Sequence, residues 1–190
     1  DATIATIDNP AISIDDLIEL MPGPDFPTGG IILGRLGIKS AFHTGRGSVV
    51  LRGRVHTEEL RKDREALIIT EIPYQVNKSL MIERIAEMVR DKKIEGISDI
   101  RDESSRQGMR VVIEIKRDAM ADVVLNQLYR FSQLQSTFSV NNIALTGGRP
   151  EQLNLKDLLQ AFITFREEVV TRRTKFLLNK ARDRAHILVG

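Results

Sequence analysis

The chain has 190 residues, of which 42% are hydrophobic and 28% charged, so it can build a folded core and disorder is disfavoured. Its net charge is only +2, so the overall charge does not indicate a binding partner. Any argument from charge must rest on where the charged residues lie in the sequence. The lack of Cys excludes disulfides, thiolate metal sites and cysteine nucleophiles, and it fits a reducing, cytoplasmic compartment. No apolar run approaches the roughly 20 residues of a membrane span, so no membrane partner is expected.

The first thirty residues predict two short helices followed by a stiff connector. The helical pattern over residues 1–20 is broken at Asn9 and Pro10, and Ser13 is a suitable N-cap for the second helix. The sequence MPGPDFPTGG at residues 21–30 carries three prolines, which exclude regular helix, and ends in two glycines, which release the chain into a new element. We place a domain boundary after this connector.

Residues 31–153 carry the pattern of an α+β fold. Asn77 and Asp118 are expected to cap two of the helices, and EELRKDRE at residues 58–65 is expected to form the irregular, solvated tip of a hairpin. The sequence order predicts a mostly antiparallel sheet with helices on one face and the other face left available. Strands are expected over residues 31–33, 48–55, 66–72, 97–101, 109–115 and 138–145, and helices over 37–43, 78–93 and from Asp118 to about Tyr129.

From residue 155 to the end the pattern is one uninterrupted helix, for which Asn154 is a plausible cap. At about 1.5 Å per residue this helix would exceed about 50 Å, which suggests a projecting arm that pairs with segments outside this chain. Arg166 and Arg173 interrupt its apolar stripe, so a regular coiled coil is not indicated. A chain that starts at Asp1 and stops inside a helical pattern is expected to be part of a longer protein. The expected divisions are residues 1–30, 31–153 and 154–190.

The most unusual stretch is residues 26–57, which contains no Asp or Glu. A polyanion would explain this, because phosphates attract Lys and Arg and a carboxylate within the footprint would repel them. A solvated basic face without a ligand explains it equally well. On the predicted strand 48–55, Arg52 and Arg54 would share one face. The basic residues of the stretch are Arg35, Lys39, His43, Arg46, Arg52, Arg54 and His56.

Residue spacing offers little catalytic chemistry. The three histidines are far apart, so surface or locally bonded roles are favoured over a metal site. Tyr74 and Tyr129 have no neighbouring base that would activate a phenol, which favours packing roles. The sequence Gly45-Arg46-Gly47 is neither a dinucleotide fingerprint nor a P-loop; it fits a tight turn into a strand, and its N–H groups could also face a phosphate.

Several longer runs of sequence resemble the A subunits of bacterial type IIA DNA topoisomerases, and those of DNA gyrase more closely than those of topoisomerase IV. The similarity extends over essentially the whole chain. The matching runs are MPGPDFPTGG at residues 21–30, TGRGS at 44–48, TEIPYQVNK at 70–78, IAEMVRDKKIEGISDIRDES at 85–104, GMRVVIEIKRDA at 108–119 and VVTRRTKFLLNKARDRAHIL at 169–188.

The resemblance implies an enzyme in which two A subunits and two B subunits form an A2B2 heterotetramer. The A subunits cleave a double-stranded DNA segment through a tyrosine that follows an Arg, and a second duplex is passed using ATP hydrolysed by the B subunit, with Mg²⁺ as a further cofactor. Neither Tyr74 nor Tyr129 follows an Arg. The resemblance therefore implies a fragment that covers the end of the winged-helix domain, the tower domain and the start of the coiled-coil arm, and that lacks the catalytic residue and bound cofactors.

In such enzymes the tower holds the outer arms of a bent gate duplex, which gives the acid-free stretch a role. The resulting prediction is that phosphates are contacted by Arg35, Lys39, Arg46, Arg52 and Arg54, with His43 and Lys78 as weaker candidates. The arm cations are expected to pair with acids such as Glu168 and Asp183 in preference to DNA. The alternative reading is a standalone α+β nucleic-acid binding or scaffold module without enzymatic activity.

Overall fold

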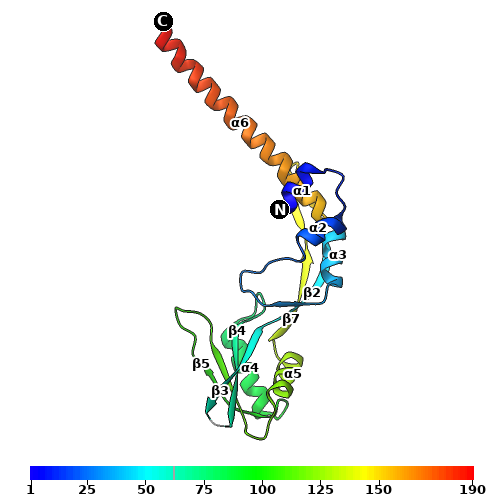
Figure 1. Ribbon diagram of the computed structural model, residues 1–190, viewed down its shortest axis with the longest axis vertical. Coiled ribbons are helices and arrows are strands. Elements are labelled where there is room, and N and C mark those ends of the chain that lie inside the picture. The colour runs from blue at the N-terminus through cyan, green and yellow to red at the C-terminus, as the bar shows by residue number, and fades with distance from the viewer. Residues whose placement is uncertain (62) are drawn as a thin grey trace. The chain divides into compact units, whose positions relative to one another are not determined.

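The computed structural model describes residues 1–61 and 63–190 (Figure 1). It comprises two compact units, each assembled from separate stretches of the chain. Unit 1 consists of Asp1–Gly23, Lys39–Gly47 and Val140–Gly190, and unit 2 consists of Pro24–Ile38 and Ser48–Ser139. The predicted division into residues 1–30, 31–153 and 154–190 is not tested by these units and stays a prediction.

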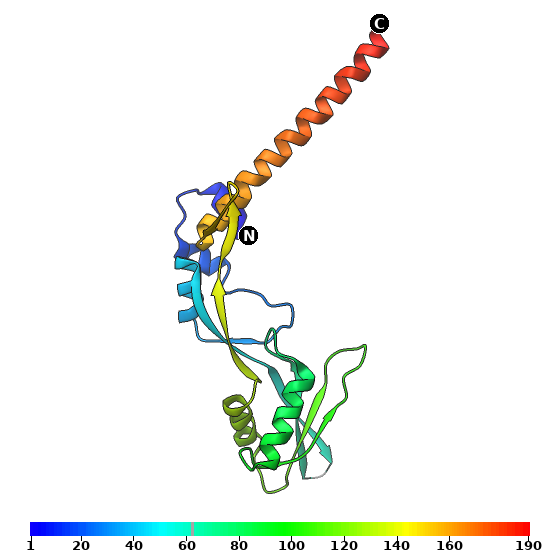
Figure 2. The same ribbon diagram turned by 180° about the vertical axis from the view of Figure 1, so that it is seen from behind.

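Unit 2 is built on a four-stranded antiparallel sheet in the order β3-β4-β6-β5, and two helices pack on one of its faces (Figure 2). Alternate residues such as Leu67 and Ile113 point from the strands into a dry core with Met81 and Leu128 of the helices. The predicted α+β class is confirmed. The elements are β3 (Arg54–Arg61), β4 (Arg64–Glu71), β5 (Ile97–Asp102), β6 (Val111–Ile115), α4 (Lys78–Arg90) and α5 (Ala121–Phe131).

The two helices begin and end for local reasons. The Asn77 side chain accepts a hydrogen bond from Leu80 N at 3.0 Å, which confirms it as the cap of α4. The helix ends at Arg90, earlier than predicted, because Lys92 adopts a left-handed φ of 57°. Asp118 was the wrong cap for α5: Ala119 N bonds Lys116 O at 3.0 Å in a preceding turn, and Met120 takes the N-cap position.

The predicted strand over residues 48–55 is wrong, because Gly53 divides it between two sheets. β2 (Arg46–Arg52) ends before Gly53 and pairs with β1 (Ile31–Leu33), whereas β3 begins after it and pairs with β4. Gly53 is buried; a Cβ there would lie 2.6 Å from the carbonyl oxygen of Glu71 and 2.6 Å from Cδ1 of Leu134. Only glycine fits where these chain segments approach so closely.

The β3–β4 hairpin is longer than predicted. Most of the charged stretch at residues 58–65 belongs to the two strands, which extend to Arg61 and start again at Arg64. Lys62, part of the predicted irregular tip, lies outside the described residues. The antiparallel pairing itself, with Glu58 opposite Ala66, is as predicted.

Unit 1 contains α1 (Ala2–Asp8), α2 (Ile14–Leu20), most of α3 (Leu36–Thr44) and α6 (Leu155–Val189). Ser13 and Asn154 cap α2 and α6 as predicted, with side-chain oxygens accepting from Asp16 N at 3.1 Å and Asp157 N at 2.8 Å. The predicted strand 138–145 is two strands, β7 (Gln135–Asn141) and β8 (Ile143–Thr146), and β8 forms a hairpin with β9 (Arg149–Gln152). Among the described residues, no helix combines the length and apolar character needed to cross a membrane.

The sheet face of unit 2 that α4 and α5 do not cover carries a network of ion pairs. Its apolar residues Ala66, Ile68 and Val112 are buried, and Leu60 packs against them. Arg110 holds Glu58 through two hydrogen bonds, of 2.9 and 2.6 Å, and a second arginine, Arg101, bonds Glu114, Asp99 and Glu103. These ion pairs leave Arg101, Arg110 and Glu58 partly exposed, so the face is open to solvent as predicted but carries paired charges.

This network predicts acid sensitivity. The Arg110 guanidinium, helped by His56, lowers the pKa of Glu58 from 4.5 to about 2. Because the folded pKa is depressed, the ion pair stabilises unit 2 fully above about pH 4.5, and this stabilisation is lost as pH falls toward 2. We expect Glu58→Gln to lower the free energy of unfolding at pH 7 and to converge with wild type near pH 2, as measured by urea unfolding across this range.

Glu59→Gln is the matched control for that experiment. Glu59 is the next residue of β3, is exposed, and forms no ion pair within the described part of the chain. Parallel pH curves for wild type and Glu58→Gln would contradict the predicted coupling.

The constraint at Gly53 gives a second prediction. Gly53→Ala should reduce the free energy of unfolding by at least about 2 kcal/mol, because the new methyl group meets backbone as well as side chain. Gly34→Ala serves as the comparison: its φ is +81° but its Cβ meets nothing within 4 Å, so only the backbone cost of about 1 kcal/mol is expected. Equal losses at both positions, measured by denaturant unfolding, would argue against a steric limit at Gly53.

Candidate nucleic-acid interface

In unit 1, the turn from α3 into β2 fixes where three of the predicted cations lie. Gly45 has a φ of +77°, and a Cβ on it would lie 2.6 Å from the carbonyl oxygen of Leu153. The carbonyl oxygen of Arg46 accepts hydrogen bonds from Ser40 Oγ and Thr44 Oγ1, both at 2.9 Å. These bonds hold the start of β2 against α3. The Gly45-Arg46-Gly47 sequence is therefore the tight turn that the sequence suggested.

Lys39 and His43 are four residues apart on α3 and so lie on the same side of the helix. Lys39 and Arg46 are exposed, and neither forms an ion pair within the described residues. His43 is also exposed, but its Nε2 lies 3.2 Å from Oδ1 of Asp15 on α2. We call Lys39, His43 and Arg46 the α3 surface. Asp15 is the carboxylate that reaches it from outside the acid-free stretch.

Arg52 is not available in the way the sequence suggested. Its Nε donates to Oε1 of Gln135 at 2.7 Å, and its guanidinium lies over the ring of Tyr129, 4.4 Å from the centroid. Tyr129 in turn donates from its hydroxyl to the carbonyl oxygen of Gly53 at 3.2 Å. Arg52 thus acts as a packing residue of unit 2.

Two more predicted cations of unit 2 are paired with carboxylates. Arg54 Nε lies 3.2 Å from Oε2 of Glu71, and the same oxygen accepts from Gly30 N, a bond that lowers the pKa of Glu71. Lys78 Nζ lies 2.6 Å from Oδ2 of Asp102, and this contact, with Ser104, lowers the pKa of Asp102 to about 2. Since Arg52 and Arg54 stand on different strands of different sheets, the predicted shared face does not exist.

Arg35 completes the predicted set. It belongs to unit 2, directly precedes α3 in the sequence and is exposed, and it forms no ion pair with any described residue. The seven predicted contacts therefore fall into two groups. In one group, Arg35, Lys39 and Arg46 form no ion pair in the described part of the chain. In the other, side chains are engaged with partners: His43, Arg52, Arg54 and Lys78.

Both tyrosines are packed. Tyr74 forms a three-ring cluster with Phe26 and Phe138, with centroids 5.2–5.8 Å apart. Burial raises the pKa of Tyr129, which keeps its phenol protonated and is the opposite of activation as a nucleophile.

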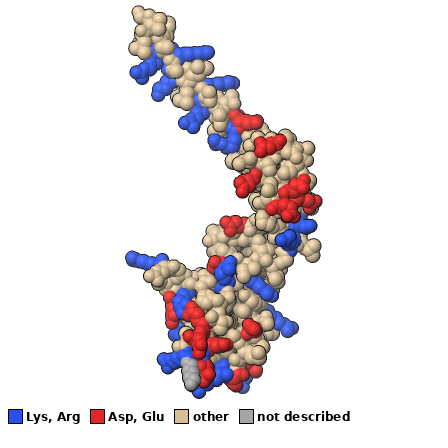
Figure 3. All heavy atoms as spheres, viewed as in Figure 1, with Lys and Arg blue, Asp and Glu red and all other residues tan. Residues whose placement is uncertain are grey.

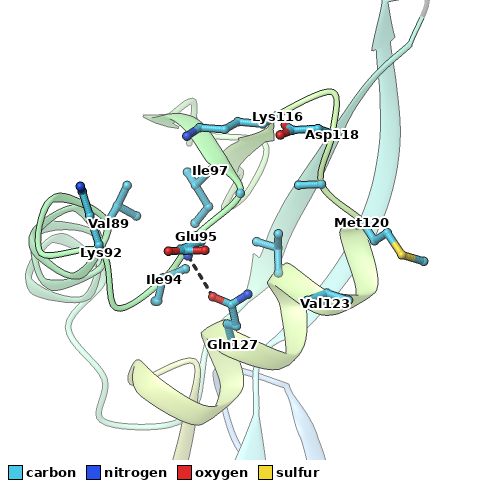
Figure 4. Close-up of a pocket in the computed structure, with 13 residues that line it drawn as sticks. Val89, Lys92, Ile94, Glu95, Ile97, Lys116, Asp118, Met120, Val123 and Gln127 are labelled. Atoms are coloured by element: carbon cyan, nitrogen blue, oxygen red, sulfur yellow. Dashed lines mark hydrogen bonds between the residues drawn. The ribbon is translucent and has the colours of Figure 1, made fainter.

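A cavity of about 640 Å³ lies in unit 2 beside the end of α4 and the start of α5 (Figure 4). Its wall is a mixture of apolar side chains, such as Met120 and Val123, and polar ones, and Glu95 N donates to Oε1 of Gln127 across it at 2.9 Å. Nothing in this lining pairs a nucleophile with a base. The described residues also bring together no group of three or more His, Asp or Glu side chains able to hold a metal ion.

Sequence reasoning missed the residues that position the α3 surface. Gln152 donates from Nε2 to the carbonyl oxygen of Thr44 at 2.6 Å, across 108 residues of sequence. Asp15 and Glu71 were likewise not anticipated as partners of His43 and Arg54. No local pattern could have indicated these contacts, because each depends on segments that only the fold brings together.

Comparison with known proteins identifies the family of this chain. The model of the family that comprises the A subunits of DNA gyrase and topoisomerase IV matches residues 1–190, and the chain belongs to this family. The chain is 63% identical over its full length to the DNA gyrase A subunit of Granulibacter bethesdensis, 57% to that of Rickettsia conorii and, over 192 aligned residues, 56% to that of Pseudomonas aeruginosa. It spans about a fifth of the length of these curated relatives, 20–21%.

The contacts of Arg52 generate a prediction that separates it from the α3 surface. Arg52→Gln removes the stacking on Tyr129, and its shorter side chain no longer places a donor against Gln135. We therefore expect the free energy of unfolding to fall by about 1–2 kcal/mol. Arg46→Gln, at an exposed position, should change it by less than about 0.5 kcal/mol. Urea unfolding of the two variants tests this contrast; an Arg52→Gln variant as stable as Arg46→Gln would mean that Arg52 is not a packing residue.

Proposed function

We propose that this chain is the part of a type II topoisomerase A subunit that holds a segment of double-stranded DNA through its phosphates. The observation that carries the proposal is the exposed, uncompensated charge of Lys39 and Arg46 on a surface that a stretch without carboxylates supplies. Membership of the family of DNA gyrase and topoisomerase IV A subunits makes duplex DNA the favoured polyanion. Membership also weighs against the alternative of a standalone binding or scaffold module.

The contacts would be to the DNA backbone and would not read sequence. Lys39 on α3 and Arg46 at the start of β2 would attract phosphates and displace condensed counterions. They present no fixed pattern of hydrogen-bond donors to the edges of the bases. Arg35 would add an independent contact from unit 2. Backbone contacts of this kind suit a duplex that is bent at the same place whatever its sequence, and we propose that the chain helps to hold the gate duplex in a bent form.

The complete enzyme would supply the chemistry. We propose ATP-dependent negative supercoiling by an A2B2 assembly in the bacterial cytoplasm, in which the B subunit hydrolyses ATP, while Mg²⁺ binds outside this chain. Tyr74 and Tyr129 are both packed, which supports a nucleophilic tyrosine elsewhere in the complete protein. The role proposed for this chain is to position the DNA. The chain alone would then not cleave DNA.

The test is the salt dependence of DNA binding by the complete protein. Lys39→Gln with Arg46→Gln should lower the slope of log affinity against log salt concentration by about 0.9 for each phosphate that is no longer neutralised, hence by about 2, when a labelled duplex of about 30 base pairs is titrated. Arg35→Gln alone should lower it by about 1.

Arg84→Gln with Arg90→Gln is the matched control. Both residues are exposed on α4, and the pair removes the same charge without touching the α3 surface. If the slope responds equally to both double variants, the effect belongs to net charge and the proposed surface is wrong.

A further inference from the structure

The outer part of α6, residues 172–189, carries most of the positive charge of unit 1. It contains six Lys and Arg residues and a single Asp, whereas residues 155–171 of the same helix contain two Lys and Arg residues and three Asp and Glu residues. Figure 3 shows the blue side chains projecting along this part of α6, while the visible red side chains of the unit lie nearer the base of the helix. One helix is therefore divided into a near-neutral inner part and a strongly basic outer part.

Neighbouring carboxylates do not neutralise this charge. Arg172 lies 3.4 Å from Glu168, an exposed pair one helical turn apart, as expected from the sequence. The other expected acid, Asp183, forms no ion pair within the described residues, and none is found for the remaining five cations of the segment. Because exposed pairs of this kind contribute little even where they form, the cations are available for another partner.

The spacing of the cations places three of them in one row. Arg173, Lys180 and Arg184 are separated by seven and four residues, which returns each to nearly the same side of the helix. At about 1.5 Å per residue the row is about 16 Å long. The apolar residues Leu177 and Leu188 follow Arg173 and Arg184 by four residues, so they lie on the same side of the helix as the row. Lys and Arg have long side chains that can carry their charged ends past apolar neighbours of this kind.

We propose that this row, Arg173, Lys180 and Arg184, binds the phosphates of a DNA duplex as a contact surface separate from the α3 surface. The inference rests on the proposed function, because the family favours DNA over other polyanions. A duplex carries one negative charge for about every 1.7 Å of its axis, so a row of this length faces several phosphates. The row itself contains no carboxylate, and Asp183 is the single acidic residue of the segment against six cations.

The proposal is tested in the complete protein with Arg173→Gln, Lys180→Gln and Arg184→Gln combined. Gln has a helix propensity close to that of Lys and Arg, so α6 should be preserved. The slope of log affinity against log salt for a labelled duplex of about 30 base pairs should fall by about 2–3. The matched control is Arg84→Gln, Arg90→Gln and Lys93→Gln, which removes the same charge from exposed positions in and after α4.

A photo-crosslinking amino acid gives a direct readout of position. Phe176 is 66% exposed and lies close to the row, whereas Thr174 faces the apolar side of the helix and bonds Val170 O at 2.8 Å. A benzophenone side chain at Phe176 should crosslink to the labelled duplex, and one at Thr174 should not. Crosslinks from Phe176 to protein and none to DNA would assign the row to a partner helix and overturn the proposal.

The variants distinguish failure of this inference from failure of the proposed function. If the slope falls for the α3-surface double variant and not for the α6 triple variant, the α6 contact is overturned and the proposed function stands. The reverse result keeps the α6 contact and overturns the role given to Lys39 and Arg46. Binding of the complete protein to anionic phospholipid vesicles that is abolished in the triple variant and not displaced by duplex would assign the row to a membrane surface and also overturn it.

Discussion

The close approach at Gly53 is the constraint on which the arrangement of unit 2 depends. At this residue the chain leaves the β1-β2-β7 sheet and enters the four-stranded sheet, and there is no room for a side chain between Glu71 and Leu134. The carbonyl of Gly53 accepts from Tyr129, and its N–H donates to the carbonyl oxygen of Leu134 at 2.8 Å. One residue without a Cβ thus joins two sheets, and both of its backbone polar groups are satisfied where water is excluded.

The same constraint decides what the neighbouring arginines do. Arg52 and Arg54 are two residues apart and identical in chemistry, yet Arg52 stacks on an aromatic ring and Arg54 meets a carboxylate. Lys39 and Arg46 carry the same type of charge and, among the residues that the structure describes, meet neither an aromatic ring nor a carboxylate. Positive charge in the sequence is therefore a poor guide to a binding surface by itself, because the fold uses part of it for its own packing and leaves the rest exposed.

Local features of the fold could be predicted from the sequence, and contacts across it could not. Ser13, Asn77 and Asn154 were found because a cap acts on a backbone N–H three residues away. The strand over residues 48–55 was wrong because alternation continues through Gly53, and nothing local reveals the crowding by Leu134. At the candidate surface, the absence of carboxylates from residues 26–57 identified the basic residues. Asp15 and Glu71, which pair with two of them, belong to other segments of the chain. Only the three-dimensional contacts therefore distinguish the exposed cations from the engaged ones.

The ion pairs over the open sheet face have a consequence for how the chain behaves among copies of itself. β3 and β5 are the edge strands of the four-stranded sheet, and an unpaired edge is a template for adding another strand. Glu58 on β3 and Arg101 on β5 hold their charges at these edges through bonds to Arg110 and Glu114. An incoming strand would have to bury or displace these charges, so the ion-pair network also makes edge-to-edge aggregation unfavourable.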